Sequence, residues 1–156
     1  MPAVLKDKVS IFISYAHADE DLKNELDKHL TGLKRSKKIE TWNDRQLIAG
    51  QEWDEVIKTE LERSDIILLL ISIDFIASQY IWDKELATAM KRHEEGTAHV
   101  VPIILKNCLW QEMPFAKLQA LPRNAKPVTT YAIDDDAYTE ISVSLNQLVN
   151  SMIKKS

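Results

Sequence analysis

One glutamate of the chain stands where a carboxylate can do chemistry. Glu85 lies in the segment 78–86, just after the most apolar run of the sequence, residues 66–72. A strand made from that run is buried on both faces, so the next helix begins at the carboxyl edge of a parallel sheet. Open α/β sheets bind their ligands at that edge. Trp82 precedes Glu85 by three residues, which places a large ring one helical turn from the carboxylate.

A lone carboxylate suits one kind of glycoside cleavage. Hydrolysis of an ordinary sugar linkage needs a second group as acid, because the leaving oxygen must be protonated. A pyridinium leaves without protonation, so one carboxylate beside an oxocarbenium-like ribose can suffice to split NAD+. The sequence has no Gly-rich phosphate loop, no nucleophile elbow and no histidine or cysteine spacing typical of a metal site. It therefore predicts neither a metal nor a resident cofactor.

Length and composition limit the class of protein. The chain has 156 residues, of which 45% are hydrophobic, so we expect one domain, 1–156, with a core of its own. A net charge of −4 argues against a nucleic-acid-binding surface. No apolar run approaches the roughly 18 residues of a membrane-spanning helix, and the first residues show no signal-peptide pattern. With a single cysteine, Cys108, the sequence favours a cytoplasmic protein that binds neither membranes nor nucleic acid directly.

Strand-like and helix-like segments alternate along the chain. The hydrophobic pattern predicts strands at 9–14, 38–42, 66–71, 100–105 and 127–131. It predicts helices at 19–33, from Trp53 through 61, at 74–95 with a break near Ser78, and at 134–153. This alternation favours a flavodoxin-like three-layer α/β sandwich with a five-stranded, mostly parallel sheet of order 2-1-3-4-5. In this arrangement we expect Trp53 to pack in the core.

The carboxyl edge between the first and third strands gathers polar residues from three segments, which are 14–17, 42–45 and 72–85. The candidates for substrate contact are Ser14, Tyr15, His17, Asp44, Arg45, Ser78 and Trp82. Each has an ordinary alternative, because the serines can cap helices and Trp82 can pack in the core. Tyr15 and His17 can be plain strand-end residues, while Asp44 and Arg45 can serve only the loop. Arg45 can instead meet a pyrophosphate.

Several segments, in the right order, resemble the TIR (Toll/interleukin-receptor) domain family. They are similar to its opening strand, its BB loop with the following helix, its third strand, its active-site helix, and the fourth strand with the loop after it in bacterial members. These segments are 11–19, 42–53, 64–72, 78–86, 101–105 and 110–115. The resemblance covers residues 8–152. One departure is Ile81, which stands where catalytic relatives often carry tryptophan, so the nearby rings are Tyr80 and Trp82.

The resemblance implies a function. Many bacterial and plant TIR domains hydrolyse NAD+ to nicotinamide and ADP-ribose or a cyclic isomer, and the glutamate that matches Glu85 is catalytic in them. NAD+ is then the substrate rather than a cofactor. The family also implies an antiphage or immune effector that is activated by self-association through the BB loop, which begins at Asn43 and ends at Gln51. A sensor domain or a partner chain is expected to control it.

Two other interpretations remain open. The first is a non-catalytic TIR module that acts only through protein–protein contacts, in which Glu85 is a solvated helix residue paired with Lys84 or Arg92. Glu85 in its helix favours the enzyme, because an adaptor does not need that carboxylate. The second is a phosphoacceptor receiver domain, which shares the strand order. A receiver needs an aspartate at the end of its third strand, where this chain has Ser72.

Overall fold

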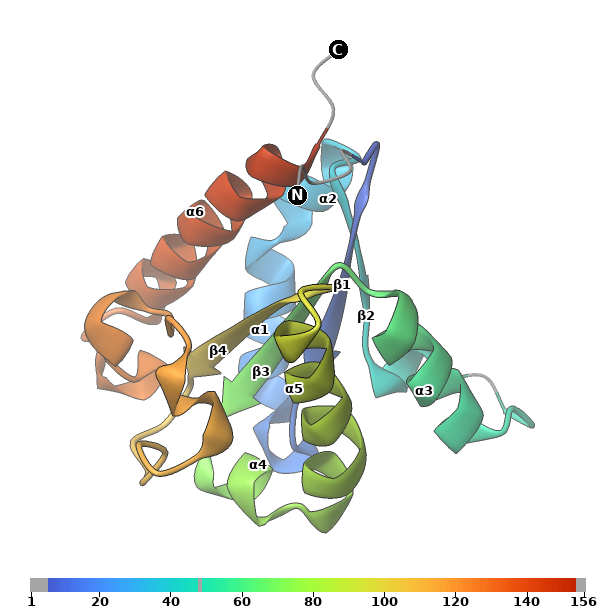
Figure 1. Ribbon diagram of the computed structural model, residues 1–156. Helices are drawn as coiled ribbons and strands as arrows, with labels where there is room; N and C mark the ends of the chain where they lie inside the picture. Colours follow the sequence, from blue (N-terminus) through green and yellow to red (C-terminus); the bar gives the residue numbers. More distant parts are fainter. Residues whose placement is uncertain (1–5, 48, 154–156) are drawn as a thin grey trace.

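A computed structural model describes residues 6–47 and 49–153, apart from the side chain of Arg45. Its centre is a four-stranded parallel sheet of order β2-β1-β3-β4 (Figure 1). The strands are β1 (Val9–Ser14), β2 (Ile39–Trp42), β3 (Ile66–Ile71) and β4 (His99–Ile104). β3 is buried along its whole length, as its continuous apolar sequence predicts.

Helices cover both faces of the sheet, which confirms the predicted three-layer α/β sandwich (Figure 1). One face packs against α1 (Glu20–His29) and α6 (Asp134–Met152), and the short α2 (Thr31–Arg35) follows α1. The other face packs against α3 (Trp53–Arg63), α4 (Ile73–Ala77), the π-helical segment η3 (Ile81–Leu86) and α5 (Ala87–Glu94). Alternate residues of each strand enter opposite cores, as the two-residue repeat of a strand requires.

The predicted fifth strand at 127–131 was wrong. That segment contains a 3₁₀ turn, η6 (Val128–Thr130), and Leu121 is the residue that bridges to the outer edge of β4. The Leu121 N–H donates to the Pro102 carbonyl at 2.9 Å, and the Leu121 carbonyl accepts from the Ile104 N–H at 2.8 Å. Pro102 has no N–H to offer on this edge, so a longer ladder would lack a donor at its centre.

Two predicted helices are interrupted. The helix expected at 19–33 divides at Leu30, whose N–H is shared between the carbonyls of Leu26 and Asp27 at 3.1 Å each. The helix expected at 74–95 breaks at Ser78, as predicted, and then continues through η3 into α5. Ser78 assists this restart because its Oγ accepts a hydrogen bond from the Ile81 N–H at 3.3 Å. The break lets η3 turn back toward the end of β1, where Ser14 lies.

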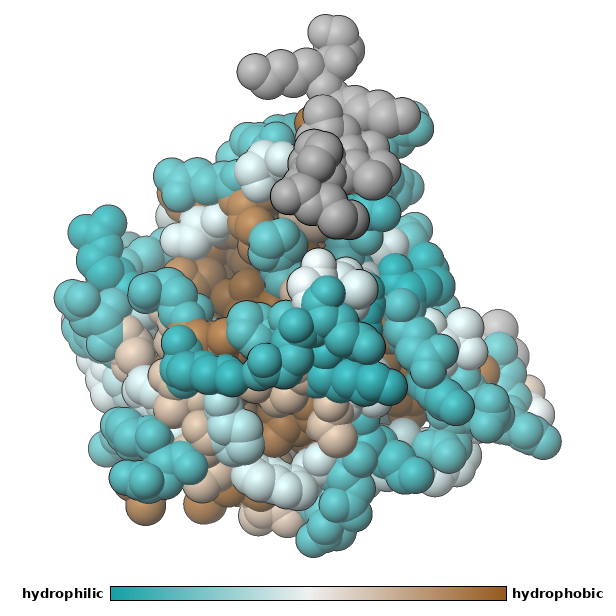
Figure 2. Space-filling view, in the orientation of Figure 1, coloured by the Kyte–Doolittle hydropathy of each residue, from teal (hydrophilic) through white to brown (hydrophobic). Residues whose placement is uncertain are grey.

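The surface is mainly hydrophilic, as expected for a chain whose apolar residues pack in the two cores. Figure 2 shows that hydrophilic residues dominate one face of the molecule and that hydrophobic residues lie mostly in the hollows between them. Among the described helices, none combines the length and the apolar composition that crossing a lipid bilayer requires.

Candidate functional site

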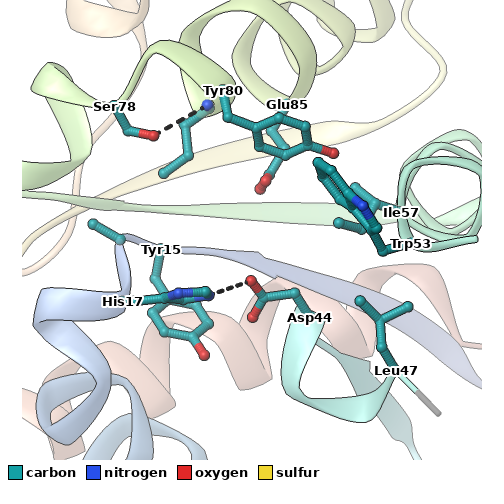
Figure 3. Close-up of a pocket in the computed structure, with 11 residues that line it drawn as sticks. Tyr15, His17, Asp44, Leu47, Trp53, Ile57, Ser78, Tyr80 and Glu85 are labelled. Carbon is teal, nitrogen blue, oxygen red and sulfur yellow. Dashed lines mark hydrogen bonds and ion pairs between the residues drawn. The ribbon is translucent and has the colours of Figure 1, made fainter. Parts of the chain in front are cut away.

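A cavity of about 550 Å³ opens at the carboxyl end of β1, where the sequence placed the ligand site. Its walls come from the residues after β1, the turn η2 (Asp44–Gln46) with the loop after it, the start of α3, and the segment from Ser78 into η3. Figure 3 shows the Glu85 carboxyl group pointing into the space between these walls. The lining residues are Tyr15, Ala16, His17, Asp44, Leu47, Trp53, Ile57, Ser78, Tyr80, Ile81 and Glu85.

Glu85 is held in η3 with only 7% of its surface exposed. Its Oε1 atom accepts a hydrogen bond of 2.7 Å from the Ser14 hydroxyl. Burial raises the pKa of Glu85 from 4.5 to about 7; the Ser14 hydrogen bond opposes this rise, the nearby Asp44 carboxylate adds to it and His17 opposes it. Glu85 therefore exchanges its proton near neutral pH. π-helical turns of this kind occur frequently at functional sites.

Ser14 contacts the Glu85 carboxyl group from the protein interior rather than from the cavity. It is the last residue of β1, is fully buried, and is not among the residues that line the cavity. Its side chain lies on the same face of β1 as Phe12, which is the face toward α3 and η3. Ser14 was predicted to contact substrate, and the structure shows it contacting Glu85.

His17 and Asp44 face Glu85 from the other side of the cavity. The His17 Nε2 atom lies 2.5 Å from Asp44 Oδ2, which joins the residues after β1 to the loop after β2 (Figure 3). The centroids of the Tyr15 and His17 rings lie 5.9 Å apart. The Lys23 ammonium group lies over the Tyr15 ring, 5.0 Å from its centroid. The predicted candidates Tyr15, His17 and Asp44 are thus brought together.

Two further rings form the opposite wall. The Trp53 and Tyr80 rings lie 5.0 Å apart and are tilted by 51°, and both line the cavity. The Tyr80 hydroxyl donates to Asp54 at 3.3 Å, and burial together with nearby carboxylates raises its pKa. The expected core position of Trp53 was wrong, because 53% of its surface is exposed. Trp53 is the first residue of α3, so its side chain projects beyond the sheet edge instead of packing on the sheet.

The remaining candidates have different positions. Ser78 lines the cavity, and its hydroxyl also caps the Ile81 N–H. Trp82 does not belong to the lining; it is half-buried and packs against the apolar core on the α5 side of the sheet. The side chain of Arg45 falls outside the described residues, so its proposed contact stays a prediction. In the described part of the chain, no group of three metal-binding side chains gathers.

Sequence reasoning did not name six of the lining residues as site residues, and these are Ala16, Leu47, Trp53, Ile57, Tyr80 and Ile81. A signal for Trp53 was present, because the first residue of a helix that begins at the carboxyl edge lies near the ligand site. Its helical spacing with Val56 and Ile57 suggested the core more strongly. The cavity combines two carboxylates, an imidazole and three aromatic rings, and this set can hold a cationic, planar ligand against Glu85.

Comparison with known proteins agrees with the fold and the order of the motifs. The TIR domain family matches residues 11–140. The chain is also similar to an uncharacterized protein, y4lF, of Sinorhizobium fredii (strain NBRC 101917 / NGR234), with 46% identity over 138 residues. That match takes in 88% of this chain but 43% of the relative, so the chain spans less than half of the curated relative that it matches.

Proposed function

The chain belongs to the TIR domain family, and from that premise we propose that it is an NAD+ glycohydrolase. The observation that carries the proposal is the buried Glu85 carboxyl group, which is oriented by Ser14 and points into an aromatic-walled cavity. A non-catalytic interaction module does not need a carboxyl group placed in this way. No lysine or arginine among the described residues pairs with Glu85, so its burial costs folding free energy, and catalysis gives a reason for such a placement.

The proposed reaction breaks the bond between the nicotinamide nitrogen and C1′ of the ribose. The electron pair stays on nitrogen, so the positive pyridinium becomes neutral nicotinamide while positive charge develops on the ribose. The Glu85 carboxylate, which is 7% exposed, stabilises that charge at short range. Ser14 acts as a positioning residue because it fixes one carboxylate oxygen and leaves the other for the substrate. Water then adds its oxygen to C1′ and releases one proton to the solvent, which gives ADP-ribose. Attack of an adenine nitrogen on C1′ in place of water gives the cyclic isomer.

We assign the nicotinamide-stacking role to the ring wall of Tyr80 and Trp53. Ile81 stands four residues before Glu85, and Trp82 lies outside the cavity lining, whereas Tyr80 and Trp53 both face the cavity. Stacking of an aromatic ring on a base is worth about 1–3 kcal/mol. The substrate contacts predicted for Asp44 and Arg45 stay predictions, and for Arg45 the predicted partner is the pyrophosphate.

The proposal includes a cellular setting. We place the chain in the cytoplasm as a bacterial antiphage or immune effector that a sensor domain or a partner chain controls. Self-association through the loop from Asn43 to Gln51 would complete or close the site, since Leu47 of that loop already forms part of the cavity wall. Head-to-tail contacts of this kind can extend into filaments. Specific activity should then rise with protein concentration, and a flat response over a hundredfold range would contradict this activation.

The test is release of nicotinamide from NAD+ by the purified chain, assayed at high protein concentration. We expect release by the wild type and a loss of about 10²-fold or more in Glu85→Gln, because the amide keeps the size but not the charge. Glu94→Gln is the matched control, since Glu94 is an exposed glutamate on α5, distant from the cavity lining, and should leave the rate unchanged. Wild-type turnover in a folded Glu85→Gln protein would exclude the assignment.

A further inference from the structure

The described lining of the cavity at Glu85 is acidic, although the proposed substrate carries phosphate groups. Its described lining contains the carboxyl groups of Glu85 and Asp44 and the imidazole of His17, but no lysine or arginine. The Oδ1 atom of Asp44 is buried and has no hydrogen-bond partner among the described residues. Lys23 lies beyond the Tyr15 ring, is 4% exposed, and is not one of the lining residues.

The hollow next to the cavity does not supply the missing positive charge. It has a volume of about 220 Å³ and shares Ile57 and Tyr80 with the cavity wall. Its charged lining consists of three carboxylates and two ammonium groups, so the hollow is also net negative. These groups belong to Asp54, Glu55, Asp83, Lys58 and Lys84. The net negative charge of this hollow should repel a phosphate that extends from the cavity on this side.

The same features favour a cation. The rings of Tyr15, Trp53 and Tyr80 surround a cavity that holds two carboxyl groups, and aromatic faces together with carboxylates attract positively charged rings. The pyridinium of a nicotinamide nucleoside carries that charge next to the ribose. Once the glycosidic bond is broken, nicotinamide is neutral and the attraction that held it is lost, which favours its release.

We propose that the cavity recognises the nicotinamide riboside part of its substrate alone, and that the chain hydrolyses free nicotinamide riboside in preference to the 5′-phosphorylated mononucleotide. This inference rests on the proposed function and names the substrate class of the same site. The bond between C1′ and the pyridine nitrogen breaks, and its electron pair remains on nitrogen. A water molecule adds its oxygen to C1′ and gives up one proton to the solvent, so the products are ribose, nicotinamide and H+.

The test compares nicotinamide riboside, nicotinamide mononucleotide and NAD+ as substrates of the purified chain, with nicotinamide release as the readout. At low ionic strength we expect kcat/KM for the riboside to exceed that for the mononucleotide on the order of tenfold, from the repulsion between its phosphate and the cavity carboxylates. The cleavage rates of the riboside and the mononucleotide should respond to added salt in opposite directions. Added salt screens attraction and lowers the rate for the cationic riboside, whereas it screens repulsion and raises the rate for the anionic mononucleotide.

Two variants with the same change in charge sharpen the comparison. Asp44→Asn should lower the ratio of riboside to mononucleotide cleavage severalfold, because it removes one of the cavity carboxylates. Asp74→Asn is the matched control, since Asp74 is exposed on α4 and is absent from the cavity lining, so the ratio should not change. An equal shift of the ratio in both variants would show that overall charge, rather than the cavity, sets the preference, and would overturn the inference.

The two proposals fail in different ways. If NAD+ is cleaved and the mononucleotide matches or exceeds the riboside at low salt, the cavity tolerates phosphate, and only this inference is overturned. A phosphate contact from Arg45, as the sequence predicts, would produce that result. If the folded wild type cleaves none of the three compounds at high protein concentration, the proposed function is overturned, and the inference with it.

Discussion

Two carboxyl groups are buried at the carboxyl edge of the sheet, and they differ in what neutralises them. Asp19 accepts a hydrogen bond from Ser72 and lies 2.8 Å from the Lys106 ammonium group. Glu85 accepts a hydrogen bond from Ser14, but no lysine or arginine among the described residues pairs with it. A serine hydroxyl thus bonds both carboxyl groups, but only Asp19 is also paired with a lysine among the described residues.

The difference separates a structural role from a chemical one. Ser72 follows β3, Lys106 follows β4, and Asp19 precedes α1, so their contacts join three segments at one end of the sheet. The contact with Asp19 raises the pKa of Lys106, as expected for a stable pair. Among the described residues Glu85 has no such partner, and it lies at a cavity, so a cationic substrate can supply the missing charge. Countercharge, rather than burial, distinguishes the two groups.

The largest expected effect is the loss of stability when the Asp19 pair is broken. Lys106→Met should lower the free energy of unfolding by about 3–5 kcal/mol, because it leaves the buried Asp19 carboxylate without its countercharge. Chemical denaturation measures this loss. Asp19→Ala should also destabilise, because it leaves the Ser72 hydroxyl without its partner, and the double variant should lose less than the sum of the two single losses. Strictly additive losses would show that Asp19 and Lys106 do not stabilise one another.

Glu85→Gln should change stability in the opposite direction. The pKa of Glu85 is about 7 in the folded protein and 4.5 in the reference state, so the folded state binds the proton more tightly. The stability that this proton contributes is present below pH 4.5 and is lost as the pH rises to about 7. At pH 8, removal of the buried charge should raise the free energy of unfolding by about 3 kcal/mol.

Denaturation curves of the wild type and Glu85→Gln at pH 5 and pH 8 test this prediction. The gain should be much smaller at pH 5, where most Glu85 in the folded protein is already neutral. A variant that is destabilised at pH 8, as Asp19→Ala is expected to be, would show that Glu85 contributes to the fold like Asp19.

The sequence was sufficient for much of this comparison. The apolar run at 66–71 predicted the central strand, and the alternation of segments predicted the layers and the position of Glu85 at the sheet edge. It was insufficient where the outcome depended on neighbours distant in the chain. The 127–131 segment looks like a strand by itself, but the edge that it would join carries Pro102. Ser14 has no sequence signal as the hydrogen-bond partner of Glu85, because that contact joins residues 71 positions apart.

The rings show the same limit. Spacing placed Trp82 one helical turn from Glu85, but the turn at Ser78 and the π-helical geometry of η3 change which side chains reach the cavity. Tyr80, Ile81 and Glu85 line it, whereas Trp82 packs against the core. A regular helical projection cannot predict this outcome, since it assumes an unbroken repeat of 3.6 residues.

The rate of NAD+ cleavage should follow the ionisation of Glu85. We expect this change in rate to correspond to a smaller free energy than the changes in stability above. The carboxylate is the reactive form, so kcat/KM for NAD+ should rise with pH and level off above about 7. At one pH unit below the pKa, the rate should be about tenfold lower than on the plateau. A pH series with stability checked at each point measures this. A flat profile from pH 5.5 to 8 would indicate a carboxyl group with an ordinary pKa, and the contrast with Asp19 would lose its basis.

The smallest expected effect separates the two tryptophans. Trp53→Ala should raise KM for NAD+ about fivefold, because an exposed ring beside a cation contributes about 1 kcal/mol, and its loss should barely change the melting temperature. Trp82→Ala is the matched variant, and it should lower the melting temperature because the half-buried ring packs against the core, with KM unchanged. Steady-state kinetics and thermal melts on both proteins distinguish the roles. The reverse outcome, with KM raised only in Trp82→Ala, would return the stacking role to the ring that the sequence first indicated and would remove Trp53 from the site.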